Sequence, residues 1–294
     1  MLLEAYTVLG LWACTAWSRT AFQVFHSSNF TPPELQVNKS GAALADGYLF
    51  ITPTLFTLDQ APLIMSDSGE LIWNGPLESS TNFLVQTLKG QSVLTWWTGI
   101  ASNLGRGYGQ VNIVDQTYTQ IYTVCPDIQV LTTSGMSSGC SLDLHESLIT
   151  ETGTMLCTLV NVTRADLTSL GGPVDGWVLD TLFLEVDIAT NDILFMWSPT
   201  QAGIPINSTK SQRSPISGTG TAQSSPFDWF HANSVSKLQD GSYIVNSRNT
   251  WSTYCVGSDG KVKWTLEGST GGDFAPLPDG ADFVSDSTPY IKDS

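Results

Sequence analysis

Residues 226–248, PFDWFHANSVSKLQDGSYIVNSR, combine a strand–turn–strand pattern with side chains that can bind an oxyanion. The turn sequence QDG at 239–241 separates two alternating runs, which predicts a β-hairpin. His231, Asn233 and Arg248 flank this hairpin. An imidazole, a carboxamide and a guanidinium can together hold and attack a small oxyanion. The stretch therefore indicates both a β fold and a candidate site.

The same sequence pattern, a turn followed by a strand, recurs along the chain and ends each time on a tryptophan. SDSGELIW ends at Trp73, ATNDILFMW at Trp197 and GSDGKVKW at Trp264. Each combines a tight turn with an alternating run, as hairpins do. With 26 glycines, 10 tryptophans and only 13% charged residues among 294, the chain is predicted to be all-β, as a β-propeller. The uneven spacing of the tryptophans leaves a β-sandwich as the alternative.

Further strand candidates lie between these tryptophans, and no stretch has sustained helical periodicity. The candidates are residues 47–53, 82–87, 92–97, 110–114, 120–124, 154–160 and 243–247. Residues 201–225, rich in Gly, Ser, Thr and Pro, are predicted to form a long surface loop. This loop is either a lid for the neighbouring candidate site or an insertion without a role.

The charge balance excludes a nucleic-acid partner. The chain has 12 Lys and Arg residues and 27 Asp and Glu residues, which gives a net charge of −15, and it contains no basic run. A polyanion would have to bind against this field.

The N-terminal sequence predicts export. Residues 5–17, AYTVLGLWACTAW, are too short to span a bilayer but match the apolar part of a signal peptide. Cleavage after Ala16 or Ala21 is predicted, so residues 1–21 are assigned as the signal, although Glu4 stands where a basic residue is expected. A first core strand is the alternative. Four glycosylation sequons add support for a secreted protein without an integral membrane segment; they begin at Asn29, Asn38, Asn161 and Asn207.

Four cysteines remain if Cys14 leaves with the signal peptide. They allow two disulfides in three connectivities. Cys125 and Cys140 bracket a Gly/Ser/Thr-rich loop and are the preferred pair, with Cys157 and Cys255 left over. No CxxC pair or histidine cluster accompanies them, so we expect no metal site.

Two of the three histidines have neighbours that suit catalysis. His145 is flanked by Asp143 and Glu146, and a carboxylate beside an imidazole fixes its tautomer and raises its basicity. An ordinary exposed histidine with solvated acidic neighbours is the alternative. His26 has no partner of note and receives no role.

The aromatic residues around His231 predict a partly desolvated position, where charge counts for more. Asn233 would share a face with His231 in a strand. Arg248 offers a planar fork that fits sulfate, phosphate or carboxylate. The run GRGYG at 105–109 lacks the lysine and following helix of a phosphate loop and is interpreted as a tight β-turn.

The chain resembles the fungal arylsulfotransferase-like proteins, relatives of bacterial arylsulfate sulfotransferases. The resemblance runs from about Val24 to about Phe283 and is most specific at DLHE, EVDIAT and FDWFHANSV. It is carried in order by SGAALADGYLFITP, LIMSDSGELIWNGP, FLVQTLKGQSVLTWWTG, GYGQVNIVD, DLHESLITETGTML, DGWVLDTLFLEVDIATNDILFMWS, FDWFHANSV and DGSYIVNSR.

The resemblance implies a six-bladed β-propeller over residues 22–283, of which about four blades are present. It also implies a ping-pong transfer of sulfate from an aryl sulfate to a phenol, without a nucleotide donor or other cofactor. By motif position, His231, Asn233 and Arg248 resemble the residues that stabilise the transferring sulfuryl group. His145 resembles a further active-site histidine.

The sequence departs from the family pattern after Phe283. The family continues into a Gln-His-Asp element, which carries the expected covalent histidine, whereas this chain continues as VSDSTPYIKDS over 284–294. We therefore expect a C-terminally truncated protein with impaired transfer. A splice product, an incorrect gene model or a decayed gene would account for it. The alternative functions are a secreted, non-catalytic propeller that binds a ligand or partner, and a poorly folding product without a role.

Overall fold

The computed structural model describes residues 30–41, 47–53, 59–102, 105–278 and 283. Within these residues the fold is built from β-strands, with two single-turn 3₁₀ helices, η1 (Thr168–Leu170) and η2 (Ile206–Ser208), and no α-helix. The prediction of an all-β fold is confirmed. The predicted signal peptide, His26 and the tail at 284–294 lie outside the described residues.

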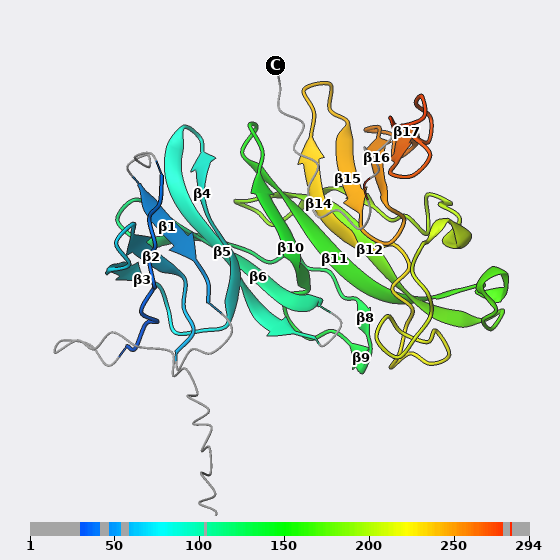
Figure 1. Cartoon of the computed structure of the whole chain (residues 1–294), viewed down its shortest axis with the longest axis horizontal. Helices are drawn as coiled ribbons and strands as arrows, with labels where there is room; N and C mark the ends of the chain where they lie inside the picture. The colour runs from blue at the N-terminus through cyan, green and yellow to red at the C-terminus, as the bar shows by residue number, and fades with distance from the viewer. Residues whose placement is uncertain (1–29, 42–46, 54–58, 103–104, 279–282, 284–294) are drawn as a thin grey trace, which may run out of the picture.

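Most strands belong to four successive antiparallel meanders, which lie side by side in sequence order (Figure 1). The first contains β1 (Tyr48–Ile51), β2 (Leu63–Ser66) and β3 (Leu71–Asn74). The second contains β4 (Ser80–Leu88), β5 (Gln91–Ala101), β6 (Gly107–Val114) and β7 (Gln120–Val124). The third contains β10 (Leu142–Ile149), β11 (Thr154–Ala165), β12 (Gly176–Asp187) and β13 (Ile193–Trp197). The fourth contains β14 (Ala232–Lys237), β15 (Tyr243–Ser247), β16 (Ser252–Val256) and β17 (Val262–Glu267).

Each predicted strand corresponds to a strand of these meanders. The pattern that ends on a tryptophan marks the end of three of the four meanders. Trp73, Trp197 and Trp264 lie in β3, β13 and β17, the last strand of the first, third and fourth meanders. The second meander ends with β7 at Val124 instead of a tryptophan. This missing tryptophan explains the uneven spacing along the sequence.

The second and third meanders join into one eight-stranded sheet where β6 pairs with β10, at Gly109 opposite Leu142. Strand β10 also lies against β4 and β14. On the β4 side, Asn82 Nδ2 donates to the carbonyl of His145 at 3.0 Å and Gln86 Nε2 to that of Ser147 at 2.8 Å. These amides take the place of a backbone ladder between the first strands of the second and third meanders.

One disulfide closes the connection between the second and third meanders. It joins Cys125, directly after β7, to Cys140, two residues before β10, which confirms the predicted pair. The loop that it closes contains the short pair β8 (Leu131–Thr132) and β9 (Gly135–Met136). Cys157 and Cys255 are buried, free, and on different sheets, so they do not form the second bridge that the cysteine count allows.

The predicted loop at 201–225 contains η2 and one isolated bridge between Ser214 and Gly218. The loop is anchored through the Arg213 side chain, which donates to the carbonyls of Leu170, Gly171 and Thr219. These contacts fix it against the η1 turn.

Candidate active site

Strand β10 places Asp143 and His145 on the same face, because side chains two apart in a strand point the same way. Asp143 Oδ2 lies 2.7 Å from His145 Nδ1. The carboxylate also accepts the backbone N–H of Gly107 at 2.8 Å and the hydroxyl of Thr158 at 3.3 Å. With Asp143 only 1% exposed, the carboxylate of this histidine–carboxylate pair is buried.

A second pair forms in the loop that precedes β14. His231 Nδ1 makes a short hydrogen bond to Asp228 Oδ2, and both side chains are buried. His231 has a φ of 58°, so it occupies the left-handed region that residues other than glycine seldom adopt. The turn after β15 holds this conformation: the backbone N–H of Arg248 donates to the carbonyl of His231 at 2.9 Å.

The guanidinium of Arg106 lies between the two pairs. Its Nη2 donates to both carboxylate oxygens of Asp228, at 3.0 and 3.3 Å, and its Nη1 is 3.9 Å from Asp143 Oδ2. Nη1 is also 3.5 Å from His145 Nδ1 and 3.4 Å from the carbonyl of Ala232. Arg106 is 1% exposed, so it connects β10 with the loop before β14 inside the protein.

The glycines around Arg106 explain its position. The ring of Trp97 packs on Gly107 and Gly109, where an added Cβ would lie 2.6 and 2.8 Å from the indole. The indole Nε1 donates to the carbonyl of Leu142 at 2.9 Å, at the start of β10. The run predicted as a tight β-turn is a turn only as far as Arg106, because β6 already begins at Gly107, and this turn delivers Arg106 to the two histidines.

The electrostatics keep both carboxylates ionised. Burial alone would raise the pKa of Asp228, but the charge of Arg106 and the bond from His231 lower it to about 2. Burial likewise opposes ionisation of Asp143, yet its bond to His145 and the charges of His145 and Arg106 hold its pKa well below the usual range. Burial and then the Arg106 charge lower the pKa of His231 to about 4, so its imidazole is neutral at pH 7.

The two imidazole rings meet edge to face, with centroids 5.1 Å apart and an angle of 82° between their planes. An ionised carboxylate only accepts hydrogen bonds, so each Nδ1 carries the proton and Nε2 is the nitrogen left for chemistry. No hydrogen bond from a described residue reaches either Nε2. The His145 side chain is 18% exposed and the His231 side chain 7%. The site thus presents two oriented imidazole nitrogens at a largely buried position.

The family of the chain follows from its sequence. The sequence model described as "Arylsulfotransferase (ASST)" matches residues 84–287, more than half of the chain. The chain belongs to the arylsulfotransferase family. No curated protein matches the chain.

Among solved structures, the chain is similar to a crystal structure of a protein of unknown function from Bacteroides caccae. The two share 12% sequence identity over 71% of this chain and 70% of the other, with a TM-score of 0.29. This low similarity supports no argument about fold or activity.

In this arylsulfotransferase-family chain, the structure brings His145 and His231 together. Asn233 follows His231 by two residues in β14, and Arg248 reaches His231 through its backbone N–H. Asn233 is partly buried in β14, but a β-bulge between Ala232 and Ser234 and the left-handed His231 break the simple strand alternation. The prediction that His231 and Asn233 share a face required both to lie in one continuous strand. His231 lies before the start of β14, so this requirement is not met. Arg248 is exposed in the turn after β15, and its backbone supports His231.

Two residues of the site were not identified from the sequence: Arg106 and Asp228. The guanidinium between the histidines is that of Arg106, from the run interpreted as a turn. Asp228 stands three residues before His231, and its spacing to the histidine was the available signal. Glu146, the other acidic neighbour of His145, contacts β14 instead, where its Oε2 accepts the N–H of Val235 at 3.4 Å.

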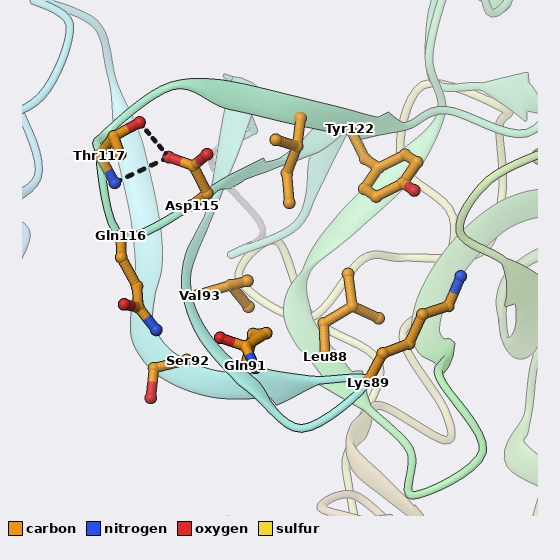
Figure 2. A pocket seen from close by; sticks show the side chains of 10 residues that line it. Leu88, Lys89, Gln91, Ser92, Val93, Asp115, Gln116, Thr117 and Tyr122 are labelled. Atoms are coloured by element: carbon orange, nitrogen blue, oxygen red, sulfur yellow. Dashed lines mark hydrogen bonds between the residues drawn. The ribbon is translucent and has the colours of Figure 1, made fainter.

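Two hollows lie elsewhere on the surface. One of about 440 Å³ is bounded by the β4–β5 hairpin and the β6–β7 turn, with Leu88, Val93 and Tyr122 around it (Figure 2). Another of about 600 Å³ lies between the β10–β11 and β14–β15 turns. None of the candidate site residues lines either hollow. Among the described residues, no group of three or more His, Cys, Asp or Glu side chains could hold a metal ion, and no helix is long and apolar enough to cross a membrane.

Proposed function

We propose that this site transfers sulfate from an aryl sulfate to a phenolic acceptor without a nucleotide donor. The observation that carries the proposal is the pair of imidazoles, His145 and His231, each bonded through Nδ1 to a buried carboxylate and set edge to face. Membership of the arylsulfotransferase family gives the substrate class: a small aromatic sulfate ester and a phenol.

The chemistry of the transfer suits two oriented imidazole nitrogens. The S–O bond of the donor breaks, an S–O bond to the acceptor forms, and one proton passes from the acceptor phenol to the leaving phenolate. A neutral imidazole such as that of His231 takes the acceptor proton at Nε2. The proton is then proposed to pass to the leaving phenolate by way of the neighbouring imidazole of His145, so that both histidines return to their starting state. Asn233 and the Arg248 fork are proposed to stabilise charge on the sulfuryl oxygens.

We further propose that the four meanders are blades of a β-propeller. Strands β4, β10 and β14 would be inner strands, which is supported by the contacts of β10 with both of the others. Because β10 and the loop before β14 carry the histidines, the site would then lie near the propeller axis.

Turnover by the present sequence is proposed to be slow. The sequence contains no Gln-His-Asp element, which the family resemblance associates with the covalent histidine. The test measures nitrophenolate release from 4-nitrophenyl sulfate with phenol as acceptor. This chain is compared with a version extended by a relative's Gln-His-Asp segment and following strands. Slow release by the chain and faster release by the extended form support the proposal.

A non-catalytic binding module is the competing function. It predicts no release by either form, together with binding of 4-nitrophenyl sulfate that survives replacement of both His145 and His231 by alanine. Calorimetric titration of the ester into the double variant measures this binding. Retained binding with no transfer in either form would replace the enzyme proposal by the binding-module proposal.

We also propose that the protein is exported. The Cys125–Cys140 disulfide supports an oxidising compartment. Of the sequon asparagines within the described residues, Asn38 and Asn207 are exposed, whereas Asn161 is partly buried in β11 and its Oδ1 accepts the N–H of Leu131. Expression in a secretory host tests this proposal: glycan on Asn38 or Asn207 in the medium supports it, and an unglycosylated protein retained in the cytosol contradicts it.

A further inference from the structure

We propose that Arg106 is a positioning residue of this site, which holds the two histidine–carboxylate pairs together and keeps His231 neutral instead of binding the sulfate group. The inference rests on the proposed function and extends it to a residue that lies outside the predicted set of His145, His231, Asn233 and Arg248.

The first support is that the guanidinium is already occupied by protein groups. Nη2 donates hydrogen bonds to both oxygens of Asp228. Nη1 lies near Asp143 and donates to the carbonyl of Ala232. Only Nε lacks a partner among the described residues. An arginine that binds a sulfate bidentately needs two free parallel N–H groups. In Arg106 both terminal nitrogens already have protein partners, so a bidentate sulfate fork would have to come from another residue.

The second support is the charge around His231. The groups that face it come from three elements: Asp228 from its own loop, Arg106 from the turn before β6, and His145 from β10. The buried Asp228 carboxylate beside the imidazole would by itself favour its protonation. The fixed positive charge of Arg106 offsets it, and burial with this charge lowers the pKa of His231 to about 4.

The consequence is a division of roles between a fixed cation, Arg106, and a neutral proton acceptor, His231. Arginine stays protonated at every pH at which the protein is folded, so Arg106 supplies charge without exchanging a proton. His231 then keeps a lone pair on Nε2 across neutral and mildly acidic pH. A lysine at position 106 would keep the charge. Its single ammonium nitrogen could not donate to both Asp228 oxygens and also lie near Asp143, as the two terminal nitrogens of the guanidinium do.

The test uses nuclear magnetic resonance of protein labelled at its histidine ring nitrogens. The chain has only three histidines, so His145 and His231 can be assigned by single substitution. Wild-type protein, Arg106→Met and Arg106→Lys are titrated between pH 4.5 and 8. The matched control is Arg164→Met, because Arg164 is exposed and pairs with Asp175 and Trp177 outside the site.

We expect His231 to be mainly neutral, with its proton on Nδ1, at every pH above about 5 in wild type, Arg106→Lys and the control. In Arg106→Met its midpoint should rise by about one pH unit or more and enter the measured range. Protonation of His231 in wild type at pH 6, which requires no variant to fold, would overturn the proposal. A folded Arg106→Met protein in which His231 stays neutral throughout would also overturn it.

Sulfate transfer gives the second measurement. Arg106→Lys should keep the wild-type titration of His231 but transfer sulfate at least about ten-fold more slowly, because the fork to Asp228 is lost. If the titrations behave as expected and no protein transfers sulfate, the proposed function fails while the role of Arg106 stands.

Discussion

The rings of His145 and His231 lie edge to face at 5.1 Å, although one belongs to β10 and the other precedes β14 in a different sheet. Each ring is turned by its own buried carboxylate, and one guanidinium spans both pairs. The arrangement fixes which nitrogen of each imidazole is available. The proposed transfer therefore depends on Asp143, Asp228 and Arg106 as much as on the histidines.

Replacing Asp228 by asparagine tests the orientation of His231. The amide no longer requires Nδ1 to carry the proton, and Arg106 loses its closest carboxylate. We expect kcat for sulfate transfer to fall by about 100-fold or more. Asp240→Asn, in the exposed β14–β15 turn, is the control and should keep wild-type activity. Equal activity of the two variants would mean that His231 acts without its carboxylate.

Replacing Arg248 by alanine separates its side chain from its backbone. The backbone N–H that supports His231 remains, so the fold and the titration of His231 should not change. If the exposed guanidinium binds the sulfate group as proposed, KM for 4-nitrophenyl sulfate should rise by about ten-fold, a loss of about 1.4 kcal/mol. An unchanged KM would remove Arg248 from the sulfate site.

Glu146 predicts a pH dependence of stability. Burial raises the pKa of its carboxyl to about 7, despite the N–H groups of Ser147 and Val235 that favour ionisation. Between the unfolded value of 4.5 and about pH 7, the folded state holds a proton that the unfolded state has lost. The free energy of unfolding must then fall as the pH rises through this window, by at most about 3 kcal/mol because the side chain is partly exposed.

Glu146→Gln should flatten this decline. From pH 5 to pH 8 the variant should therefore lose less unfolding free energy than wild type does. Urea unfolding at the two pH values measures the difference. A wild-type protein that gains stability from pH 5 to 8 through this residue, with the gain lost in the glutamine variant, would contradict the assignment.

The fold around Arg106 depends on the absence of a side chain at Gly107. A Cβ there would lie 2.6 and 2.8 Å from two ring atoms of Trp97, which are themselves packed in the core. We expect Gly107→Ala to lower the free energy of unfolding by about 1–3 kcal/mol. Gly47→Ala is the control, since an added Cβ at Gly47 has no atom within 4 Å, and its effect should stay within about 0.5 kcal/mol. Equal effects in thermal unfolding would refute the packing argument.

The Cys125–Cys140 disulfide should contribute about 3 kcal/mol, as expected for a bridge with a sequence separation of 15. The double variant Cys125→Ser/Cys140→Ser should lose this amount in denaturant unfolding. A reducing agent should destabilise wild type to the same extent and leave the double variant unchanged. A double variant as stable as wild type would show that the β8–β9 loop is held by its other contacts.

The all-β fold could be predicted because its signals are local. Alternating runs and Asp/Gly turns specify hairpins within about ten residues, and the tryptophans that close three meanders are visible in the sequence. The disulfide was also predictable, since Cys125 and Cys140 flank a single loop.

The candidate site was only partly predictable because its contacts are long-range. His145 and His231 stand out as two of three histidines, with acidic or aromatic neighbours. Arg106 is separated from Asp228 by 122 positions, and its own neighbours are glycines that signal a turn. Only the pairing of β6 with β10 and the packing of β10 on β14 bring these groups together. Asp228 was within the quoted stretch, but the left-handed conformation of His231, which turns the ring toward it, has no local sequence signal.

The most direct test of the central claim follows radioactive sulfate from ³⁵S-labelled 4-nitrophenyl sulfate. The protein is incubated with the ester and phenol, beside the double variant His145→Ala/His231→Ala, and the labelled products are separated. We predict slow formation of labelled phenyl sulfate by the wild-type chain and at least about ten-fold less by the variant. Equal transfer by both proteins, or label released only as inorganic sulfate, would contradict the assignment of these two histidines to sulfate transfer.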